Sequence, residues 1–255
     1  MMKMFNEYIN EIRKDRFTRI FKLDDKILCK QITGRKRLIT IPLQNSPDLS
    51  FLAGIIIGDG YLGSEKRRIQ IEMSDKNILE EILKAFYSIF GIKTRLRKVK
   101  KQKENYLQTW RIVFESKEIS LLFNKIFEIP LGKKSDKVKV PSVIFTSNSE
   151  CKKSFIRGLF FADGSFKKKT IRFSSSSQKL LEGLQKLFQE MGFQSVKRYY
   201  KNKRYNKYYF ELFLMTNEAE RFKLLLPEIQ LKVRESPSQA MAQDAECAKL
   251  KDLIH

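Results

Sequence analysis

Two stretches of the chain repeat the same order of apolar, small and acidic positions. Residues 51–63 read FLAGIIIGDGYLG and residues 155–167 read FIRGLFFADGSFK, so each starts at Phe and runs into an Asp-Gly pair. Their apolar runs indicate helices that are buried over most of their surface. Asp-Gly closes both, and we expect Gly60 and Gly164 to take the left-handed C-cap conformation there.

The segments that follow the two helices match as well. Alternating residues predict strands over 68–74 and 170–176, and a helical period predicts helices over 77–91 and 179–192, each closed by Gly. A basic segment, an aromatic strand and a second helix come next, over 93–101, 106–114 and 116–127 in the first copy and over 194–204, 207–215 and 217–227 in the second. The pattern predicts an α+β fold of two pseudo-symmetric αββαββα halves, the fused form of a symmetric dimer.

The repeat divides the chain into four regions. The halves occupy 49–150 and 151–235, between an N-terminal basic extension at 1–48 and a C-terminal tail at 236–255. We expect the extension to form a basic amphipathic helix over 5–22 and short strands over 26–32 and 37–41. The tail is rich in Ala, Ser and Gln, and is expected to be loosely attached.

The amino-acid composition indicates what class of partner this fold binds. The chain has 51 Lys and Arg against 29 Asp and Glu, a net charge of +22, while 42% hydrophobic and 12% aromatic residues exclude a disordered basic tail. A folded protein with this charge is expected to bind a polyanion. Nucleic acid is favoured over a membrane, because no apolar run reaches membrane-spanning length and no strongly apolar exposed face is evident. A basic turn at 35–37 would extend such a nucleic-acid surface.

The chain has few His and Cys residues that could bind a metal ion or form disulfides. The one His is His255, and the three cysteines are far apart at Cys29, Cys151 and Cys247. This pattern excludes a His-ligated zinc site and a disulfide framework. It fits a reducing intracellular location, and an organelle and a prokaryotic cytoplasm both remain open.

Small residues at a spacing of four give each motif helix a face without side-chain bulk, at Gly54 and Gly58 in the first and at Gly158 and Ala162 in the second. Such faces let two helix backbones approach closely. If they pack about the pseudo-two-fold axis, Asp59 and Asp163 emerge side by side. Two adjacent carboxylates favour a divalent cation, and hard oxygen ligands select Mg²⁺, with Mn²⁺ or Ca²⁺ as substitutes. Metal ions held in this way suit phosphodiester hydrolysis.

At these residues the sequence resembles the LAGLIDADG homing endonucleases in their single-chain, two-motif form. The nine-letter signature falls on residues 52–60 and 156–164, with its sixth-position acid replaced by Ile57 and Phe161. The resemblance implies a monomer whose curved antiparallel sheets, with helices on one side, form a saddle over double-stranded DNA. It also implies that Asp59 and Asp163 hold the metal ions across the minor groove, joined by the backbone carbonyls of Gly58 and Ala162. Cleavage of both strands at a long, asymmetric site would follow.

The resemblance further implies a basic residue near each scissile phosphate. In the first half we expect Lys137 or Lys139, which stand just before Pro141, with Lys133 and Lys134 as competitors. In the second half Lys232 is favoured.

Alternation along the predicted strands selects candidate DNA contacts, because alternate residues share one face of a strand. Rows of Arg and Gln can read base edges in a major groove, an acid can accept from cytosine, and other basic residues suit phosphates. The candidates are Arg68, Gln70, Glu72, Arg95 and Arg97 in the first half and Arg172, Ser174, Ser176, Lys197, Arg198, Lys201, Lys203 and Arg204 in the second. Trp110 is expected in the core.

Two functions are compatible with these features. The first is a site-specific, Mg²⁺-dependent double-strand DNA endonuclease of the intron-homing type. The alternative is a non-cleaving binder on the same fold, either an RNA maturase or a DNA-binding regulator. Retention of both motif acids favours the enzyme.

Overall fold

The computed structural model describes residues 2–14, 18–31, 37–100, 107–167, 169–202 and 206–227. Lys203, Arg204, Lys232 and the predicted tail at 236–255 lie outside the described residues. No helix in the described part of the chain is long and apolar enough to cross a membrane.

The first half is built around the motif helix α2 (Pro47–Gly58). Ser46 caps the start of α2, because its hydroxyl accepts from the Leu49 amide, and Pro47 occupies the first helical turn. The strands that follow form an antiparallel sheet in the order β4-β5-β7-β6, made of β4 (Gly60–Leu62), β5 (Arg68–Met73), β7 (Trp110–Glu115) and β6 (Arg97–Lys98). Two further helices, α3 (Lys76–Phe90) and α4 (Lys117–Lys125), complete this half.

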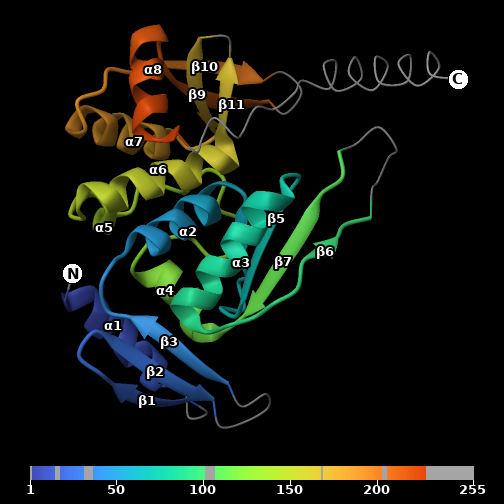
Figure 1. Ribbon diagram of the computed structural model, residues 1–255, viewed down its shortest axis with the longest axis vertical. Helices are drawn as coiled ribbons and strands as arrows, with labels where there is room; N and C mark the ends of the chain where they lie inside the picture. The colour runs from blue at the N-terminus through green and yellow to red at the C-terminus, as the bar shows by residue number, and fades with distance from the viewer. Residues whose placement is uncertain are drawn as a thin grey trace, which may run out of the picture.

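The second half repeats this arrangement in space (Figure 1). Its motif helix α6 (Ser149–Asp163) leads into an antiparallel sheet in the order β8-β9-β11-β10. The elements are β8 (Gly164–Lys167), β9 (Thr170–Ser175), β11 (Lys207–Leu214) and β10 (Val196–Asn202), with the helices α7 (Gln178–Glu190) and α8 (Thr216–Leu225). The short helix α5 (Ser142–Phe145) lies in the connection between the halves. Matching strand orders confirm the predicted duplicated α+β fold.

Burial follows the alternation of the strands. In β5, Ile69 and Ile71 are fully buried against the helices, while Arg68 and Gln70 lie on the opposite face. β9 repeats the pattern with Ile171 and Phe173 buried. Trp110 is partly buried and packs against the core, as expected. Each sheet therefore has one apolar face toward its helices and one polar face toward solvent.

The expected conformation of the motif glycines is wrong. Asp59 is the C-cap of α2 at φ −93°, and Gly164, the C-cap of α6, is extended at φ −82°. Glycine is needed for space instead: a Cβ on Gly60 would lie 2.5 Å from the Ile56 Cα, and one on Gly164 would lie 2.2 Å from the Phe160 ring. The left-handed cap does occur at Gly91, at φ 71° after α3.

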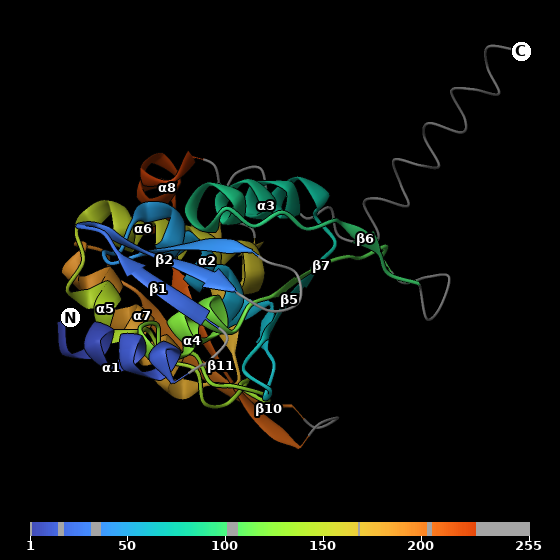
Figure 2. The same ribbon diagram turned by 90° about the horizontal axis from the view of Figure 1, so that it is seen from below.

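The N-terminal region is a small α/β unit, which we call the N-terminal unit, packed on the first half. Helix α1 (Met2–Arg13) precedes a three-stranded antiparallel sheet of β1 (Thr18–Lys22), β2 (Lys26–Gln31) and β3 (Leu38–Pro42). The predicted helix over 5–22 is therefore too long, because 18–22 pairs with β2 as a strand. Seen from below, this sheet lies in front of the first half, at the end remote from the second half (Figure 2).

Buried polar contacts fasten the N-terminal unit to α4. The Tyr8 hydroxyl donates to the Glu118 carbonyl at 3.0 Å, and the Thr18 hydroxyl donates to the Glu118 carboxylate at 3.0 Å. The Ser116 hydroxyl donates to the same carboxylate at 2.8 Å. The Gln31 side-chain amide also donates to this carboxylate, at 3.4 Å, and Glu118 is 2% exposed, so its polar atoms depend on these donors in place of water. The N-terminal unit is an integral part of the first half's core.

Candidate metal centre and nucleic-acid interface

The two motif helices cross with their backbones in contact. A Cβ on Gly54 would lie 2.2 Å from the Phe155 carbonyl oxygen, and one on Gly158 would lie 2.2 Å from the Phe51 carbonyl oxygen. The reciprocal distances show a two-fold arrangement in which each glycine faces the backbone of the other helix. Only glycine permits this separation.

The same crossing brings the two motif acids to one end of the helix pair. A Cβ on Gly58 would lie 2.2 Å from the Ala162 Cβ and 3.2 Å from Oδ2 of Asp163. The Asp163 carboxylate thus lies beside the last turn of α2, from which Asp59 directly follows. Asp59 is exposed and Asp163 is half-buried, so both are accessible from solvent.

An ammonium group occupies the end of α2. Nζ of Lys134 donates to the carbonyl oxygens of Ile56 and Gly58, at 2.8 Å each, and to that of Ile57. Burial lowers the pKa of Lys134 to about 8, although the Asp163 and Asp59 carboxylates act in the opposite direction. Lys134 therefore neutralises the negative end of the helix and lies within the field of both motif acids.

Lys134 reaches this position because the loop that carries it is anchored on both sides of the residue. The Gly132 amide donates to the Leu62 carbonyl of β4 at 2.7 Å, and its φ of 69° turns the chain there. Farther along, the Ser176 hydroxyl of the second half donates to the Ser135 carbonyl at 2.6 Å. The segment that carries Lys134 is thus held by both halves.

The chemistry of the donors at this end of the helix pair fits a divalent cation. The two carboxylates and the backbone carbonyls are hard oxygen donors, and the Gly58 carbonyl accepts from a cationic group in this structure, the Lys134 ammonium. Among the described residues no cluster of three or more His, Cys, Asp or Glu side chains could hold a metal ion. Two carboxylates with backbone carbonyls suit Mg²⁺, which keeps several water ligands and rarely uses an all-protein cage.

The two lysines favoured from the sequence differ from Lys134 in their surroundings. Lys139 forms an ion pair with Glu128. Burial alone would raise the pKa of Glu128, but hydrogen bonds from Lys139 and Ser142 hold it below its usual value. Lys137 is exposed. Of the four first-half lysines considered from sequence, the structure places Lys134 beside the acids.

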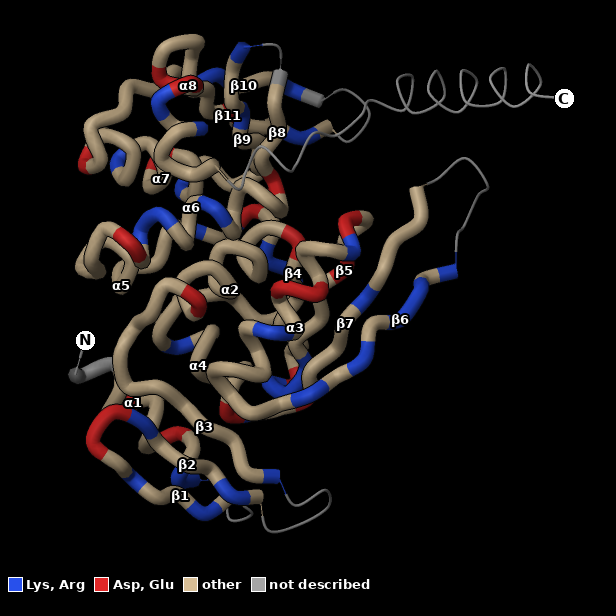
Figure 3. Tube along the Cα trace, in the orientation of Figure 1, with Lys and Arg blue, Asp and Glu red and all other residues tan. Residues whose placement is uncertain are grey.

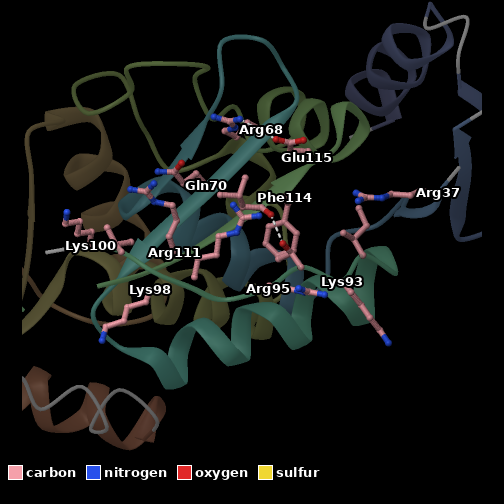
Figure 4. Close-up of a pocket in the computed structure, with 15 residues that line it drawn as sticks. Arg37, Arg68, Gln70, Lys93, Arg95, Lys98, Lys100, Arg111, Phe114 and Glu115 are labelled. Carbon is pink, nitrogen blue, oxygen red and sulfur yellow. Dashed lines mark hydrogen bonds and ion pairs between the residues drawn. The ribbon is translucent and has the colours of Figure 1, made fainter. Parts of the chain in front are cut away.

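The polar face of the first-half sheet opens into a basic groove of about 880 Å³ (Figure 4). The expected contacts Arg68, Gln70, Arg95 and Arg97 all line it. Further cationic side chains on the groove are Arg37, Lys93, Lys98, Lys100 and Arg111. Lys and Arg positions follow one another along β6 and its flanks (Figure 3). A surface of this composition suits a phosphate backbone.

Glu72, which the sequence suggested as an acceptor for a cytosine amino group, is already bound by neighbouring side chains. Its carboxylate accepts from Nε and Nη2 of Arg111, at 2.9 and 2.7 Å, and from the Thr109 hydroxyl at 2.8 Å. The two side chains are cross-strand neighbours between β5 and β7. Glu72 therefore fixes the orientation of Arg111 on the polar face, a residue that the sequence did not single out.

The register of the second-half sheet separates the candidates there. Arg172 and Ser174 pair with Phe213 and Glu211, and Glu211 pairs in turn with Arg198, so these residues share the polar face. Arg172 lies 3.2 Å from the Glu211 carboxylate, the counterpart of Arg111 and Glu72.

Lys197 and Lys201 point to the other side of the same sheet. Nζ of Lys197 lies 3.4 Å from Glu182 of α7, and Nζ of Lys201 lies over the Tyr208 ring. Phosphate contacts by these two lysines would have to come from the edge of the sheet, where β10 lies. Ser176 follows the end of β9 and binds Ser135, as described above.

Comparison with models of protein families shows to which family the chain is related. The model of the LAGLIDADG-like domain matches residues 46–127 and 150–227, one match for each half. The chain belongs to the LAGLIDADG family. The fold is shared with the homing endonuclease I-WcaI bound to its DNA recognition sequence (21% identity, TM-score 0.53, covering 74% of this chain and 87% of that one). It is also shared with I-DmoI in complex with DNA and Mn (18% identity, TM-score 0.51, covering 69% and 94%).

Curated relatives of this LAGLIDADG chain are much longer proteins. The NrdEB subunit alpha of a ribonucleoside-diphosphate reductase from Bacillus subtilis is 27% identical over 201 residues, which are 74% of this chain and 18% of the relative. A DNA polymerase from a Thermococcus species is 27% identical over 59% of this chain and 8% of its own length. The chain thus spans less than a fifth of these relatives.

Proposed function

We propose that this LAGLIDADG protein is a site-specific double-strand DNA endonuclease of the intron-homing type. The observation that carries the proposal is the convergence of Asp59 and Asp163 at one end of the crossed helices, beside the Lys134 ammonium. The first-half sheet has a basic polar face, and Arg172 and Arg198 lie on the polar face of the second-half sheet. Homing endonucleases of the same fold that were solved with DNA and Mn or Ca support the assignment.

Different residues of the chain would bind the DNA duplex and hold the metal ions for cleavage. Arg68, Arg95, Arg97 and Arg172 hold the duplex through its phosphates and base edges. Asp59 and Asp163, with the carbonyls of Gly58 and Ala162, would hold Mg²⁺, or Mn²⁺ or Ca²⁺ as substitutes. Bound metal would supply Lewis-acid stabilisation of the attacking and leaving oxygens.

We assign the assisting basic role in the first half to Lys134 rather than to Lys137 or Lys139. Its ammonium lies beside both motif acids, so it can stabilise negative charge at the phosphate that approaches them. Lys139 is engaged by Glu128 on another part of the loop. Lys232 remains the expected counterpart in the second half, outside the described residues.

The relatives support a mobile genetic origin. The matched section is a small part of proteins with unrelated names, among them a reductase subunit, a DNA polymerase and an elongation factor. A segment that recurs in such different hosts behaves as an inserted unit, as expected for a homing element. Such an enzyme would act in the compartment that holds its DNA, an organelle or a prokaryotic cytoplasm.

Cleavage of a target selected from a random duplex library tests the proposal. Wild type should bind the selected duplex and cut both strands with Mg²⁺ but not with EDTA. Asp163→Asn should lower cleavage at least a hundredfold and leave binding within about threefold, because the acid serves the metal and not the duplex. The exposed Asp24→Asn, in the turn between β1 and β2, is the matched control and should cut normally.

Tight binding without cleavage in either Mg²⁺ or Mn²⁺ would refute the endonuclease and favour the non-cleaving maturase or regulator. Equal loss of binding and cleavage in Asp163→Asn would refute the metal role of that residue.

A further inference from the structure

The start of β3 lies against the segment that walls the basic groove of the first half. The Gln31 amide donates to the Arg37 carbonyl at 3.0 Å, which extends the β2–β3 ladder to Arg37. The Leu38 carbonyl oxygen lies 3.9 Å from the position of a Cβ on Gly91, the C-cap of α3. The chain runs directly from Gly91 into the groove-lining residues that begin at Ile92.

Arg37 therefore joins the groove from a separate unit of the fold. It lines the same groove as Lys93 and Arg95, and the close-up shows these three side chains at one end of it (Figure 4). Arg37 comes from the N-terminal unit, whereas Lys93 and Arg95 belong to the duplicated half. The described part of the second half has no such added sheet, so this end of the molecule is asymmetric.

The charge at this end is uncompensated within the described residues. None of the carboxylates there forms an ion pair with Arg37, Lys93 or Arg95, and the lone acid on the groove wall, Glu115, lies 3.4 Å from Arg68. Lys93 lies over the Tyr87 ring, 4.8 Å from its centroid, which leaves its positive charge without an acid partner. Cations gathered on one wall without acid partners favour a polyanion, and long cationic side chains contact phosphates more readily than base edges.

We propose that the N-terminal unit is a third DNA-contacting module, in which Arg37 acts with Lys93 and Arg95 to hold backbone phosphates beyond the duplex segment covered by the first-half sheet. This inference rests on the proposed binding of duplex DNA and does not depend on cleavage. It predicts a footprint that extends farther from the cutting point on the first-half side than on the second-half side.

Salt-dependent binding tests the inference with a labelled 40-base-pair duplex of fixed arbitrary sequence, because phosphate contacts are independent of sequence. Arg37→Ala should lower the slope of log affinity against log salt by about 0.9, the value for one phosphate contact. Arg19→Ala is the matched control: Arg19 is exposed in the same N-terminal unit but lies on β1, and its variant should keep the wild-type slope.

Hydroxyl-radical footprinting on a selected target shows where along the duplex Arg37 makes its contact. Arg37→Ala should lose protection only at the outer edge of one half-site, while the centre stays protected. An unchanged slope and footprint in Arg37→Ala, or equal losses in Arg19→Ala, would overturn the inference. Cleavage by wild type is scored separately. A protein that binds through Arg37 without cutting would refute the endonuclease but would leave the role of the N-terminal unit supported.

Discussion

Replacing Gly54 by Ala would insert a methyl group between two helix backbones. The new carbon would lie 2.2 Å from the Phe155 carbonyl oxygen and 2.7 Å from the Leu159 amide nitrogen. Neither atom can rotate away, because both belong to the backbone of α6. Ordinary contact begins near 3.4 Å, so α2 and α6 would have to separate by about 1.2 Å at this point.

Two opposing effects set the stability of this variant. Alanine in a helix interior gains about 1 kcal/mol over glycine. Overpacking costs about 1–3 kcal/mol and sometimes more, and a gap of about 1 Å removes up to half of the attraction between the facing atoms. Because the obstacle here is backbone, we expect the upper end of this cost, for a net destabilisation of about 2 kcal/mol.

Urea unfolding of Gly54→Ala and Gly183→Ala measures the difference. Gly183 lies within α7, and a Cβ there would meet the Val140 side chain at 3.0 Å, where small side-chain movements can relieve the contact. Gly183→Ala should therefore stay within about 1 kcal/mol of wild type. Gly54→Ala should also lose more in cleavage rate than in DNA affinity, both relative to wild type, because separating the helices displaces Asp163. Equal stability of the two variants, with normal cleavage by Gly54→Ala, would refute the close backbone crossing.

Three further outcomes follow from the site. The difference in free energy of unfolding between wild type and Lys134→Met, measured by urea unfolding in EDTA, should rise by about 2 kcal/mol between pH 8 and 10. The cause is that the native state releases the Lys134 proton near pH 8, whereas the unfolded chain keeps it to about pH 10.5. A difference that does not change with pH would contradict the buried ammonium. Lys139→Ala should retain cleavage within a few-fold, whereas Lys134→Ala should lose at least tenfold in single-turnover assays, and the reverse order would restore the assignment made from sequence. Glu72→Gln should free Arg111 and relax discrimination at one base pair by about 1–3 kcal/mol in competition binding, with unchanged preference as the contrary result.

Local patterns along the chain were sufficient for much of this architecture. The duplicated motif, the alternation in β5 and β9 and the Gly-terminated helices α3 and α7 all depend on neighbours within one element, which periodicity records directly. The paired acids were also accessible from sequence, because the glycines at a spacing of four predict which helix faces meet. The helix expected over 5–22 was misjudged because pairing with β2 overrides its helical period after Arg13.

The remaining features depend on residues that are far apart in the chain. Lys134 rather than Lys139 meets the acids because Gly132 docks on β4 and the second half holds the following loop, contacts that leave no periodic signal. Arg111 is positioned by Glu72 across a strand pair, and Arg37 reaches the groove only because β3 packs beside the end of α3. The sequence alone therefore determined the repeated fold, the two acids and the cationic character of the chain, since these are properties of single elements. Only the tertiary structure decided which cations surround the acids and the groove, because that choice depends on how loops and separate sheets are brought together.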